Sequence, residues 1–551
     1  MRNVEVYKFG GVAVGSPAAL RTALDHVQRA GVPLVVVVSA MNGVTDSLLQ
    51  AAESAVRGDR PASLAIAAEF ERRHADLVRE LFPHEAPAKK LLSLLSDWTA
   101  ELRSMTDSIG VLRELTPRAQ DAVVARGERY MARLFVALLQ SKGIAAQYVD
   151  ALDLIFAERR LGTLWPDFAK CERAAKKTLA PLLAQETVPV VPGYIGRGPD
   201  GEVVTLGRGG SDFSAATLAR STGARLLTLF KEVDGLMTAD PKSVPSARVL
   251  PELHYREAAE LAYYGANVLH PRTMIPLADR KIPLLVRNTF REGVAGTRIA
   301  ADVKPGDYPV RALTAIRRQA LLSIEGGGMM GVPGVAGRAF TALSAAGHSV
   351  SMISQASSEA SICFVLPEEE AKHAIAALEE TFALERKMKL IDRITAEKNV
   401  ALIAVVGLGM RGRPGIAART FSALSASGVN IVAIAQGSSE LNITVAVSES
   451  DATGALQSLH AEYQLDKVRP LADTTGRESK LTLMGFGQIG RALAAQLTAQ
   501  EKHLHQEMGL ALKVTAIADR SGIRIEEKGF TAAALRRLAK QKASGAPLFD
   551  R

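Results

Sequence analysis

The chain has 551 residues, 47% of them hydrophobic and 23% charged, which is typical of a globular protein of three or four domains. Its net charge of +9 comes from 67 basic and 58 acidic residues, and no basic stripe interleaved with aromatic residues requires a nucleic-acid partner. No apolar stretch is long enough to cross a membrane. The strand-like start is unlike a signal peptide, and two cysteines in no motif favour a cytoplasmic protein with reduced thiols.

The first 48 residues predict a strand, a glycine loop, a helix and a second strand. Val4–Phe9 forms the first strand, and Ser16 and Pro17 suit the N-cap and first position of the helix. Leu34–Val38 is a continuous apolar run, which is typical of a strand buried on both faces. This order indicates a parallel α/β sheet.

The next 260 residues continue this α/β pattern. Residues 50–140 are mostly helical by composition, and residues 188–213 predict strand, glycine-rich hairpin, strand and loop. Leu226–Phe230 is another buried strand. Residues 303–312 carry two prolines and a glycine and predict a linker.

The second half contains an internal repeat. PGVAGRAFTALSAAGHSVSMISQASSE begins at Pro333, and PGIAARTFSALSASGVNIVAIAQGSSE begins 81 positions later at Pro414. Each copy reads as strand, helix, strand, strand and a further helix, so we expect a duplicated α+β module. From residue 480 the chain then reads strand, G-x-G-x-x-G, helix and strand, the opening of a dinucleotide-binding unit.

The loop KFGGVAVG could hold a phosphate. Its glycines allow close backbone approach, and the helix that follows offers free N–H groups and the positive end of its dipole. Lys8 lies at the carboxyl end of its strand, where open α/β sheets bind ligands. Taken alone, the loop is better explained as a strand-to-helix turn.

Three further polar loops follow predicted strands. In SAMNGVTD, Ser39 and Thr45 could bind an anion or a zwitterion. In LGRGGSDFSAA, Arg208 offers a fork for a carboxylate, while Ser211 or Asp212 could instead cap a helix that begins near Phe213. FKEVDGLMTADPK, from Phe230 to Lys242, suits the edge of a nucleotide site but is weak on its own.

Together these segments resemble the aspartate kinases of the amino acid kinase superfamily. The resemblance covers residues 4 to about 300, and it rests on motifs that agree in order and spacing: KFGG from Lys8, Ser39, Thr45, RGE from Arg126, LGRGGSD from Leu206, VDG from Val233, TADP from Thr238 and VLHPRT from Val268. It implies an α/β fold, an open and mostly parallel sheet sandwiched by helices, over residues 1–302.

The rest of the chain resembles the later parts of bifunctional aspartate kinase–homoserine dehydrogenases. The repeat is similar to paired ACT domains, which are ferredoxin-like α+β modules, over residues 313–390 and 396–470. Residues 479–551 are similar to the start of the NAD(P)-binding Rossmann unit. The resemblance therefore reaches nearly the whole chain.

The resemblance implies transfer of the γ-phosphoryl group of Mg-ATP to the side-chain carboxylate of L-aspartate, an early step of threonine, methionine and lysine biosynthesis. A carboxylate needs no general base at pH 7, so catalysis should be positioning and charge neutralisation. By resemblance, Lys8 is catalytic and Asp212 orients it. The aspartate site would comprise Ser39, Thr45, Glu128, Arg208 and Ser211, with Arg208 on the α-carboxylate and Glu128 on the ammonium. The ATP site would comprise Lys8, Gly10, Gly11, Gly209, Gly210, Lys231, Glu232, Asp240, Lys242 and Asn267.

The chain departs from the family at three places near the phosphates. Val12-Ala13 stands where the family usually has Thr-Ser, and Lys231-Glu232 stands where it has Thr-Asp. Asn267 replaces a lysine. One charged hydrogen bond contributes about 1–3 kcal/mol, so weaker ATP binding is expected.

The repeats should bind an effector and support a homo-oligomer, as paired ACT domains do in the family. Gln355 and Ser358 in the first copy, and Gln436 and Ser439 in the second, resemble the threonine-sensitive type. The lysine-sensitive type tends to carry an acid near Ser351, which this sequence lacks. Threonine is therefore the expected effector, although both segments could simply be core strands with polar ends.

The dehydrogenase part is incomplete. Gly485, Gly487 and Gly490 could hold the pyrophosphate of NADP or NAD, and Asp519 could contact a ribose. The substrate half expected from the family has no counterpart, so homoserine dehydrogenase activity is not expected. The alternatives to an aspartate kinase are a non-catalytic amino-acid sensor with a decayed kinase site, and the kinase half of a bifunctional enzyme.

Overall fold

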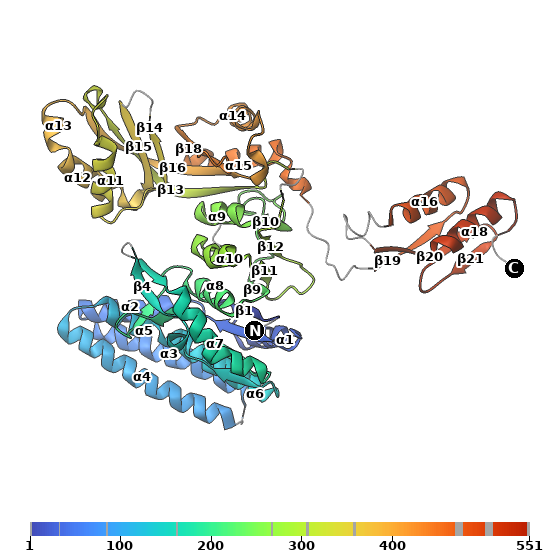
Figure 1. Cartoon of the computed structure of the whole chain (residues 1–551), viewed down its shortest axis with the longest axis horizontal. Helices are drawn as coiled ribbons and strands as arrows, with labels where there is room; N and C mark the ends of the chain where they lie inside the picture. The colour runs from blue at the N-terminus through green and yellow to red at the C-terminus, as the bar shows by residue number, and fades with distance from the viewer. Residues whose placement is uncertain are drawn as a thin grey trace. The chain divides into compact units, whose positions relative to one another are not determined.

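The computed structural model describes residues 3–31, 33–83, 86–160, 163–265, 268–304, 308–355, 360–468, 478–501 and 511–547 (Figure 1). It divides into two compact units. The first comprises Met1–Arg291 and Gly296–Val468, and the second comprises Glu292–Ala295 and Arg469–Arg551. No helix in the described ranges is both long and apolar enough to cross a membrane.

The first unit begins with an eight-stranded sheet whose strands from β11 to β3 are all parallel. β12 runs antiparallel to β11, and β10 pairs with β12 at the edge. This confirms the predicted mostly parallel sheet. In spatial order the strands are β10 (Glu252–His254), β12 (Thr297–Ala300), β11 (Leu284–Asn288), β9 (Leu226–Lys231), β1 (Glu5–Phe9), β2 (Leu34–Val38), β6 (Val188–Pro192) and β3 (Ala146–Tyr148).

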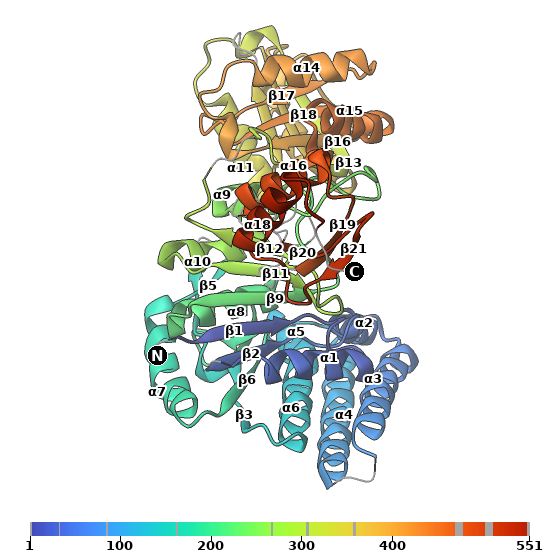
Figure 2. The ribbon, with the colours of Figure 1, turned by 90° about the vertical axis from the view of Figure 1, so that its right-hand side faces the viewer.

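Helices cover both faces of this sheet, which explains the continuous apolar run of β2. Val35 and Val37 pack into one core, whereas Val36 and Val38 pack into the other, because successive side chains point to opposite faces. The first core includes α7 (Phe168–Ala184), α8 (Gly210–Thr222), α9 (Tyr255–Tyr263) and α10 (Met274–Arg280). The second includes α1 (Pro17–Gln28), α2 (Val44–Arg57), α3 (Arg60–Leu81), α4 (Ala86–Leu112), α5 (Pro117–Val124) and α6 (Arg126–Ser141), of which α1, α3, α4 and α6 are seen below β1 and β2 in Figure 2.

The local expectations for this region are confirmed. The Ser16 side chain accepts a hydrogen bond from the Ala19 amide, and Pro17 opens α1. Residues 50–140 are mostly helical, and the glycine-rich hairpin consists of β7 and β8. The two hairpins of the region pair β4 (Ala157–Arg160) with β5 (Thr163–Pro166) and β7 (Ile195–Arg197) with β8 (Val203–Thr205).

The carboxyl ends of β1, β2, β6 and β9 lie at one edge of the sheet because these strands are parallel. The loops that begin at Gly10, Ser39, Gly193 and Glu232 therefore leave from the same edge. Open α/β sheets bind ligands at this position.

The predicted duplication appears as a second sheet, of six strands, in which each strand of the first module has a counterpart 81 residues later. Its strands in spatial order are β14 (Met352–Gln355), β15 (Ser361–Pro367), β13 (Ala312–Glu325), β16 (Arg393–Val406), β18 (Asn442–Ser448) and β17 (Ala433–Ala435). The helices are α11 (Val335–Ala345), α12 (Ala371–Thr381) and α13 (Ala383–Lys387) in the first module and α14 (Ile416–Ala426) and α15 (Ala452–Glu462) in the second. The long strands β13 and β16 pair at the centre, so the two modules share one sheet.

The expected linker is partly a packed segment. Residues 305–307 lie outside the described ranges, but Val310 and Arg311 are buried, and the Arg311 amide donates to the Val406 carbonyl. β13 begins at Ala312, directly after them. Two prolines and a glycine indicated an exposed connection, whereas the chain is held here against the end of β16.

The second unit is a small three-stranded sheet with helices. β19 pairs with β20 in parallel, and β21 pairs with β20 antiparallel. Its core includes Leu483, Phe486 and Ile517. The elements are β19 (Glu478–Met484), α16 (Gln488–Ala499), β20 (Ala511–Asp519), β21 (Gly522–Ile525) and α18 (Ala532–Ala543).

Candidate functional site

Three charged side chains meet at the carboxyl edge of the large sheet. The Lys8 Nζ lies 2.7 Å from Asp212 Oδ1, and the Lys231 Nζ donates to Asp212 Oδ2 at 2.7 Å. Lys8 comes from β1, Asp212 from the first turn of α8 and Lys231 from the end of β9. One carboxylate thus bridges two ammonium groups, of which the Lys8 group is almost fully buried.

Burial and charge compete at this cluster. Burial lowers the pKa of Lys8, and the Asp212 carboxylate opposes that effect. Burial would raise the pKa of Asp212, but the charges of Lys8 and Lys231 outweigh it and hold that pKa well below its usual range. Because the cluster sets two lysine side chains against one carboxylate, it suits the negative charge of a phosphoryl group.

α8 begins at Gly210, earlier than predicted, and no side chain caps it. The alternative role of Ser211 or Asp212 as the cap is not observed, because Gly209 occupies the N-cap in a left-handed conformation with φ of 72°. The Asp212 carboxylate is instead taken up by the two lysines. The positive end of the α8 dipole therefore stays open toward the site.

Two of the four glycine amides predicted to bind phosphate already donate to backbone carbonyls. The Gly10 amide donates to the Phe230 carbonyl at 3.4 Å, and the Gly210 amide donates to the Gly207 carbonyl at 2.9 Å. These two N–H groups already have protein acceptors, so Gly11 and Gly209 are the stronger candidates of the four predicted glycines.

Glu128 is a buried carboxylate in the first turn of α6. The Thr45 hydroxyl, from the first turn of α2, donates to its Oε1 at 3.4 Å. Its Oε2 is buried and has no hydrogen-bond partner in the described part of the chain. Burial raises the pKa of Glu128 from its ordinary value of 4.5 to about 7. A buried, unpartnered carboxylate oxygen is the arrangement that a ligand ammonium group would satisfy.

The other predicted amino-acid-binding residues surround this region. Ser39 directly follows β2, and Ser211 lies in the first turn of α8. Arg208 is exposed in the loop before α8, where its guanidinium can reach a ligand carboxylate. Arg272 supports this loop, because it donates to the Leu206 carbonyl at 3.1 Å.

Tyr194 is a neighbour of the site that the sequence reading missed. It follows β6 and has φ of 71°, an uncommon backbone conformation for a non-glycine residue. Its amide donates to the Ser214 hydroxyl at 3.0 Å, and its ring packs beside Gly210. Strained backbone is frequent at ligand sites. The only sequence signal was Gly193-Tyr194 directly after a buried strand.

A cavity of roughly 650 Å³ opens beside Lys8. Gly10, Gly11, Lys231, Glu232, Asp240 and Lys242 line it, as do Val12 and Ala13 of the divergent pair. Asn267 lies outside the described residues. Residues of the duplicated region, namely Leu313, Thr314, Ala315, Arg317 and Leu456, also line the cavity.

The cavity fits a nucleotide with its magnesium ion. No cluster of three or more His, Cys, Asp or Glu side chains forms a metal site within the described ranges. Mg²⁺ that binds with nucleotide phosphates usually takes only one or two protein carboxylates. Glu232 and Asp240 line the cavity and supply such groups.

The first repeat module has a hollow of its own, of roughly 460 Å³, beside Gln355 and the start of α11. Ser358 lies outside the described residues. Gln436 and Ser439 are exposed in the second module, where the Glu440 carboxylate accepts from the Gly412 amide at 2.7 Å. The predicted effector residues are therefore accessible in both modules where the structure describes them.

In the second unit the glycine motif joins β19 to α16. α16 begins directly after Gly487. A Cβ at Gly490 would lie 2.1 Å from the Gly485 carbonyl oxygen, so only glycine allows the helix to pack this closely. Asp519 pairs with Lys542 and accepts from the Ser521 amide and hydroxyl, which engages both oxygens of its carboxylate. The expected ribose contact of Asp519 would therefore share this carboxylate with Lys542 and Ser521.

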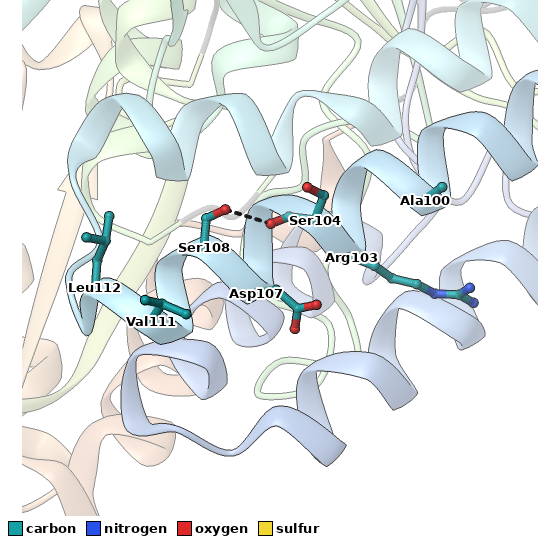
Figure 3. Close-up of a pocket in the computed structure, with 7 residues that line it drawn as sticks. All are labelled: Ala100, Arg103, Ser104, Asp107, Ser108, Val111 and Leu112. Carbon is teal, nitrogen blue, oxygen red and sulfur yellow. Dashed lines mark hydrogen bonds between the residues drawn. The ribbon is translucent and has the colours of Figure 1, made fainter.

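A separate hollow lies on the outer side of α4. Figure 3 shows that the Ser108 hydroxyl donates a hydrogen bond to the Ser104 carbonyl there. Its charged residues already have partners, since Arg103 pairs with Glu71 and Asp107 pairs with Arg60. We assign no function to this hollow.

A mostly parallel α/β sheet with a cationic cluster and a nucleotide-sized cavity is an arrangement suited to phosphoryl transfer. Comparison with known families agrees: the profile of the amino acid kinase family matches residues 3–288, and that of the ACT domain matches residues 322–382 and 403–463. The chain belongs to the amino acid kinase family and carries ACT domains.

Known relatives extend this result. The chain is 34% identical over 550 residues to bifunctional aspartokinase/homoserine dehydrogenase 1 of Arabidopsis thaliana, covering 98% of this chain and 59% of the relative. It thus spans about three fifths of that relative's length. It is 32% identical to aspartokinase 1 of Arabidopsis thaliana, covering 83% of this chain and 80% of the relative.

Solved structures also resemble the fold. Aspartokinase III of E. coli in complex with aspartate and ADP superimposes with a TM-score of 0.70 at 28% identity, covering 84% of this chain and 99% of that one. The same enzyme in complex with lysine and aspartate gives a TM-score of 0.68 over the same shares of the two chains.

Proposed function

We propose that the protein is an aspartate kinase, which transfers the γ-phosphoryl group of ATP to the side-chain carboxylate of L-aspartate. The observation that carries the proposal is the pairing of two sites: the Lys8–Asp212–Lys231 cluster beside a nucleotide-sized cavity, and the buried Glu128 carboxylate with an unpartnered oxygen. The relatives named above support it, because they are aspartokinases and one structure contains aspartate and ADP.

The site residues fall into two groups, one that binds the phosphoryl group and one that binds aspartate. Lys8 faces the transferring phosphoryl group and neutralises its charge, while Asp212 holds the Lys8 ammonium in place. Glu128 accepts the ammonium of aspartate, and Arg208 binds its α-carboxylate as a fork. Mg²⁺ would be held by Glu232 or Asp240 with the phosphates and would shield their charge. The acceptor carboxylate is already ionised, so no side chain has to remove a proton.

An assay for aspartyl hydroxamate, the product trapped when hydroxylamine meets the acyl phosphate, tests this proposal. The wild-type protein should form it with ATP and aspartate, and Lys8→Met should lower kcat at least a hundredfold because the transition-state charge loses its partner. If neither protein forms an ATP-dependent product, the result would favour the alternative, a non-catalytic amino-acid sensor.

We also propose that the ACT region binds threonine. Gln355 lines a hollow of its own, and Gln436 is its counterpart 81 residues later. Threonine should lower the kinase rate at millimolar concentration, and Gln355→Ala should weaken this response. Lysine, which is bound to the E. coli relative, is the comparison ligand. Inhibition by lysine and not by threonine would contradict the proposal.

Gel filtration at several concentrations would show whether the chain forms the homo-oligomer expected of ACT domains.

We propose that the second unit is a partial dinucleotide-binding segment of Rossmann type. Its parallel β19–β20 pair and the tightly packed glycine turn favour the segment. Homoserine dehydrogenase activity, known for longer relatives, is not expected of this chain. Homoserine-dependent reduction of NADP by the 551-residue protein would overturn that expectation.

A further inference from the structure

The wall of the nucleotide cavity is not built by the kinase part alone. Leu313, Ala315 and Arg317 come from β13, the first strand of the ACT region, and Leu456 comes from α15 of the second module. These side chains line the same cavity as Lys8. The kinase roles described above do not account for Arg317.

Arg317 is half-buried and is held by two hydroxyl groups. Its Nη2 donates to the Thr453 hydroxyl of α15 at 2.8 Å and to the Ser243 hydroxyl at 3.4 Å. No carboxylate in the described ranges forms an ion pair with it. A guanidinium with neutral partners keeps its charge and its remaining N–H groups for a ligand.

Arg317 and Lys8 come from different walls of the cavity, since Arg317 belongs to β13 and Lys8 to β1. Lys8 and Gly10 lie beside the end of β9, because Lys8 pairs with Asp212 and the Gly10 amide donates to the Phe230 carbonyl. β13 instead contacts Thr238, whose carbonyl accepts from the Leu313 amide. This part of the lining includes the apolar residues Leu236, Met237, Leu261, Val268, Leu313 and Leu456, together with the polar Ser243 that accepts from Arg317. Apolar walls with few polar groups suit a purine base.

We propose that Arg317 contacts the base and ribose of the bound nucleotide, so that the ACT region completes the nucleotide site. The inference rests on the proposed kinase function. A planar guanidinium can stack on an aromatic base and can donate to its ring nitrogens or to ribose oxygens. Because Thr453 of the second module holds Arg317, a shift of α15 would move a nucleotide ligand directly.

Arg317→Met tests the proposal, with Arg318→Met as the matched control, because Arg318 is exposed on the same strand and does not line the cavity. Calorimetric titration of the full chain with ADP and with AMP should show a loss of affinity of about tenfold for both in Arg317→Met. Arg318→Met should stay within twofold of wild type. In the kinase assay Arg317→Met should raise KM for ATP about tenfold and leave KM for aspartate within twofold.

Two further variants separate a ligand contact from a structural bridge. Thr453→Val removes one hydroxyl partner of Arg317 but keeps the guanidinium, so it should lose much less ADP affinity than Arg317→Met. Arg317→Lys should recover only part of the affinity, because lysine lacks the planar fork.

Three results would overturn the inference: unchanged ADP affinity in Arg317→Met, a loss confined to ADP and absent for AMP, or an equal loss in Thr453→Val. The titrations report on Arg317 even if aspartate is not phosphorylated. A wild type that binds ADP and forms no aspartyl hydroxamate would refute the proposed function without refuting the Arg317 contact.

Discussion

Glu128 determines whether the candidate amino-acid pocket can accept an ammonium group. Burial raises its pKa to about 7, so at pH 6 most molecules carry it protonated and at pH 8 most carry it ionised. KM for aspartate should therefore fall roughly tenfold between pH 6 and pH 8. Glu128→Gln should raise KM and remove this dependence, measured as a pH profile of kcat/KM for aspartate. A profile that stays the same in the variant would contradict the assignment.

The same shift predicts a stability effect with a defined sign. A raised pKa means that the folded state binds the proton more tightly than the unfolded state, so stability falls as pH rises from about 4.5 through 7. The full shift corresponds to roughly 3 kcal/mol above pH 7. Glu128→Gln should accordingly unfold at a higher denaturant concentration than wild type at pH 8, and this advantage should vanish below about pH 4.

Loss of the Asp212 charge should lower stability and kcat more than loss of the Lys231 charge. Removing its charge leaves two ammonium groups close together, one of them deeply buried, and breaking such a buried pair costs about 3–5 kcal/mol. Asp212→Asn should lower both the denaturation midpoint and kcat. Lys231→Met keeps the Lys8–Asp212 pair and should be milder in both respects. Equal effects of the two variants on kcat would show that Asp212 does not orient Lys8.

At the scale of elements, strong local signals were read correctly and contacts between distant segments were not. Ser16 and Pro17 predicted the start of α1, and Leu34–Val38 predicted a doubly covered strand. The start of α8 was misplaced near Phe213, because the helix begins at Gly210 after a glycine N-cap that residue preferences do not single out. The strained backbone of Tyr194 depends on its packing beside Gly210, which one sequence does not display.

The turn before α8 offers a test of backbone strain. Gly209 has φ of 72°, and a Cβ there would lie 2.5 Å from the His270 Cβ. Gly209→Ala should lose about 1–2 kcal/mol from conformation alone, more from the clash, and should lower kcat by displacing Arg208. Gly201→Ala is the control, because φ is 81° there and nothing lies within 4 Å. Similar denaturation midpoints and kcat values for the two variants would exclude the His270 contact as the cause.

At the scale of the molecule, the repeat of 81 residues predicted both modules, but not their joining. Their sharing of one sheet depends on the pairing of β13 with β16, between strands far apart in the sequence. Their attachment to the kinase part includes a shared apolar core and buried polar groups such as Glu257 and His460. Each has a partner more than a hundred residues away in the chain, which a pattern of local residues cannot identify.

These buried groups should make the kinase part and the second ACT module unfold together. Glu257 of α9 accepts from the Leu408 amide at 2.7 Å and from the His254 amide at 2.9 Å. The His460 Nε2 of α15 lies 2.9 Å from the Thr238 hydroxyl. Each buried polar group left without a partner costs about 1–3 kcal/mol. Scanning calorimetry of Glu257→Ala/His460→Ala should therefore show the first unit's transition split in two, or broadened, relative to wild type.

The variant Glu257→Gln distinguishes the effect of losing the interface hydrogen bonds from the effect of losing the negative charge. Glutamine keeps an acceptor oxygen for one of the two amides, so it should retain a single transition at a slightly lower temperature. Burial lowers the pKa of His460, so the folded protein disfavours its protonation, and the link should weaken as pH falls below about 6.5. The wild-type transition should then broaden at pH 5 but not at pH 8. A single sharp transition in the double variant at both pH values would show that these contacts do not couple the two parts.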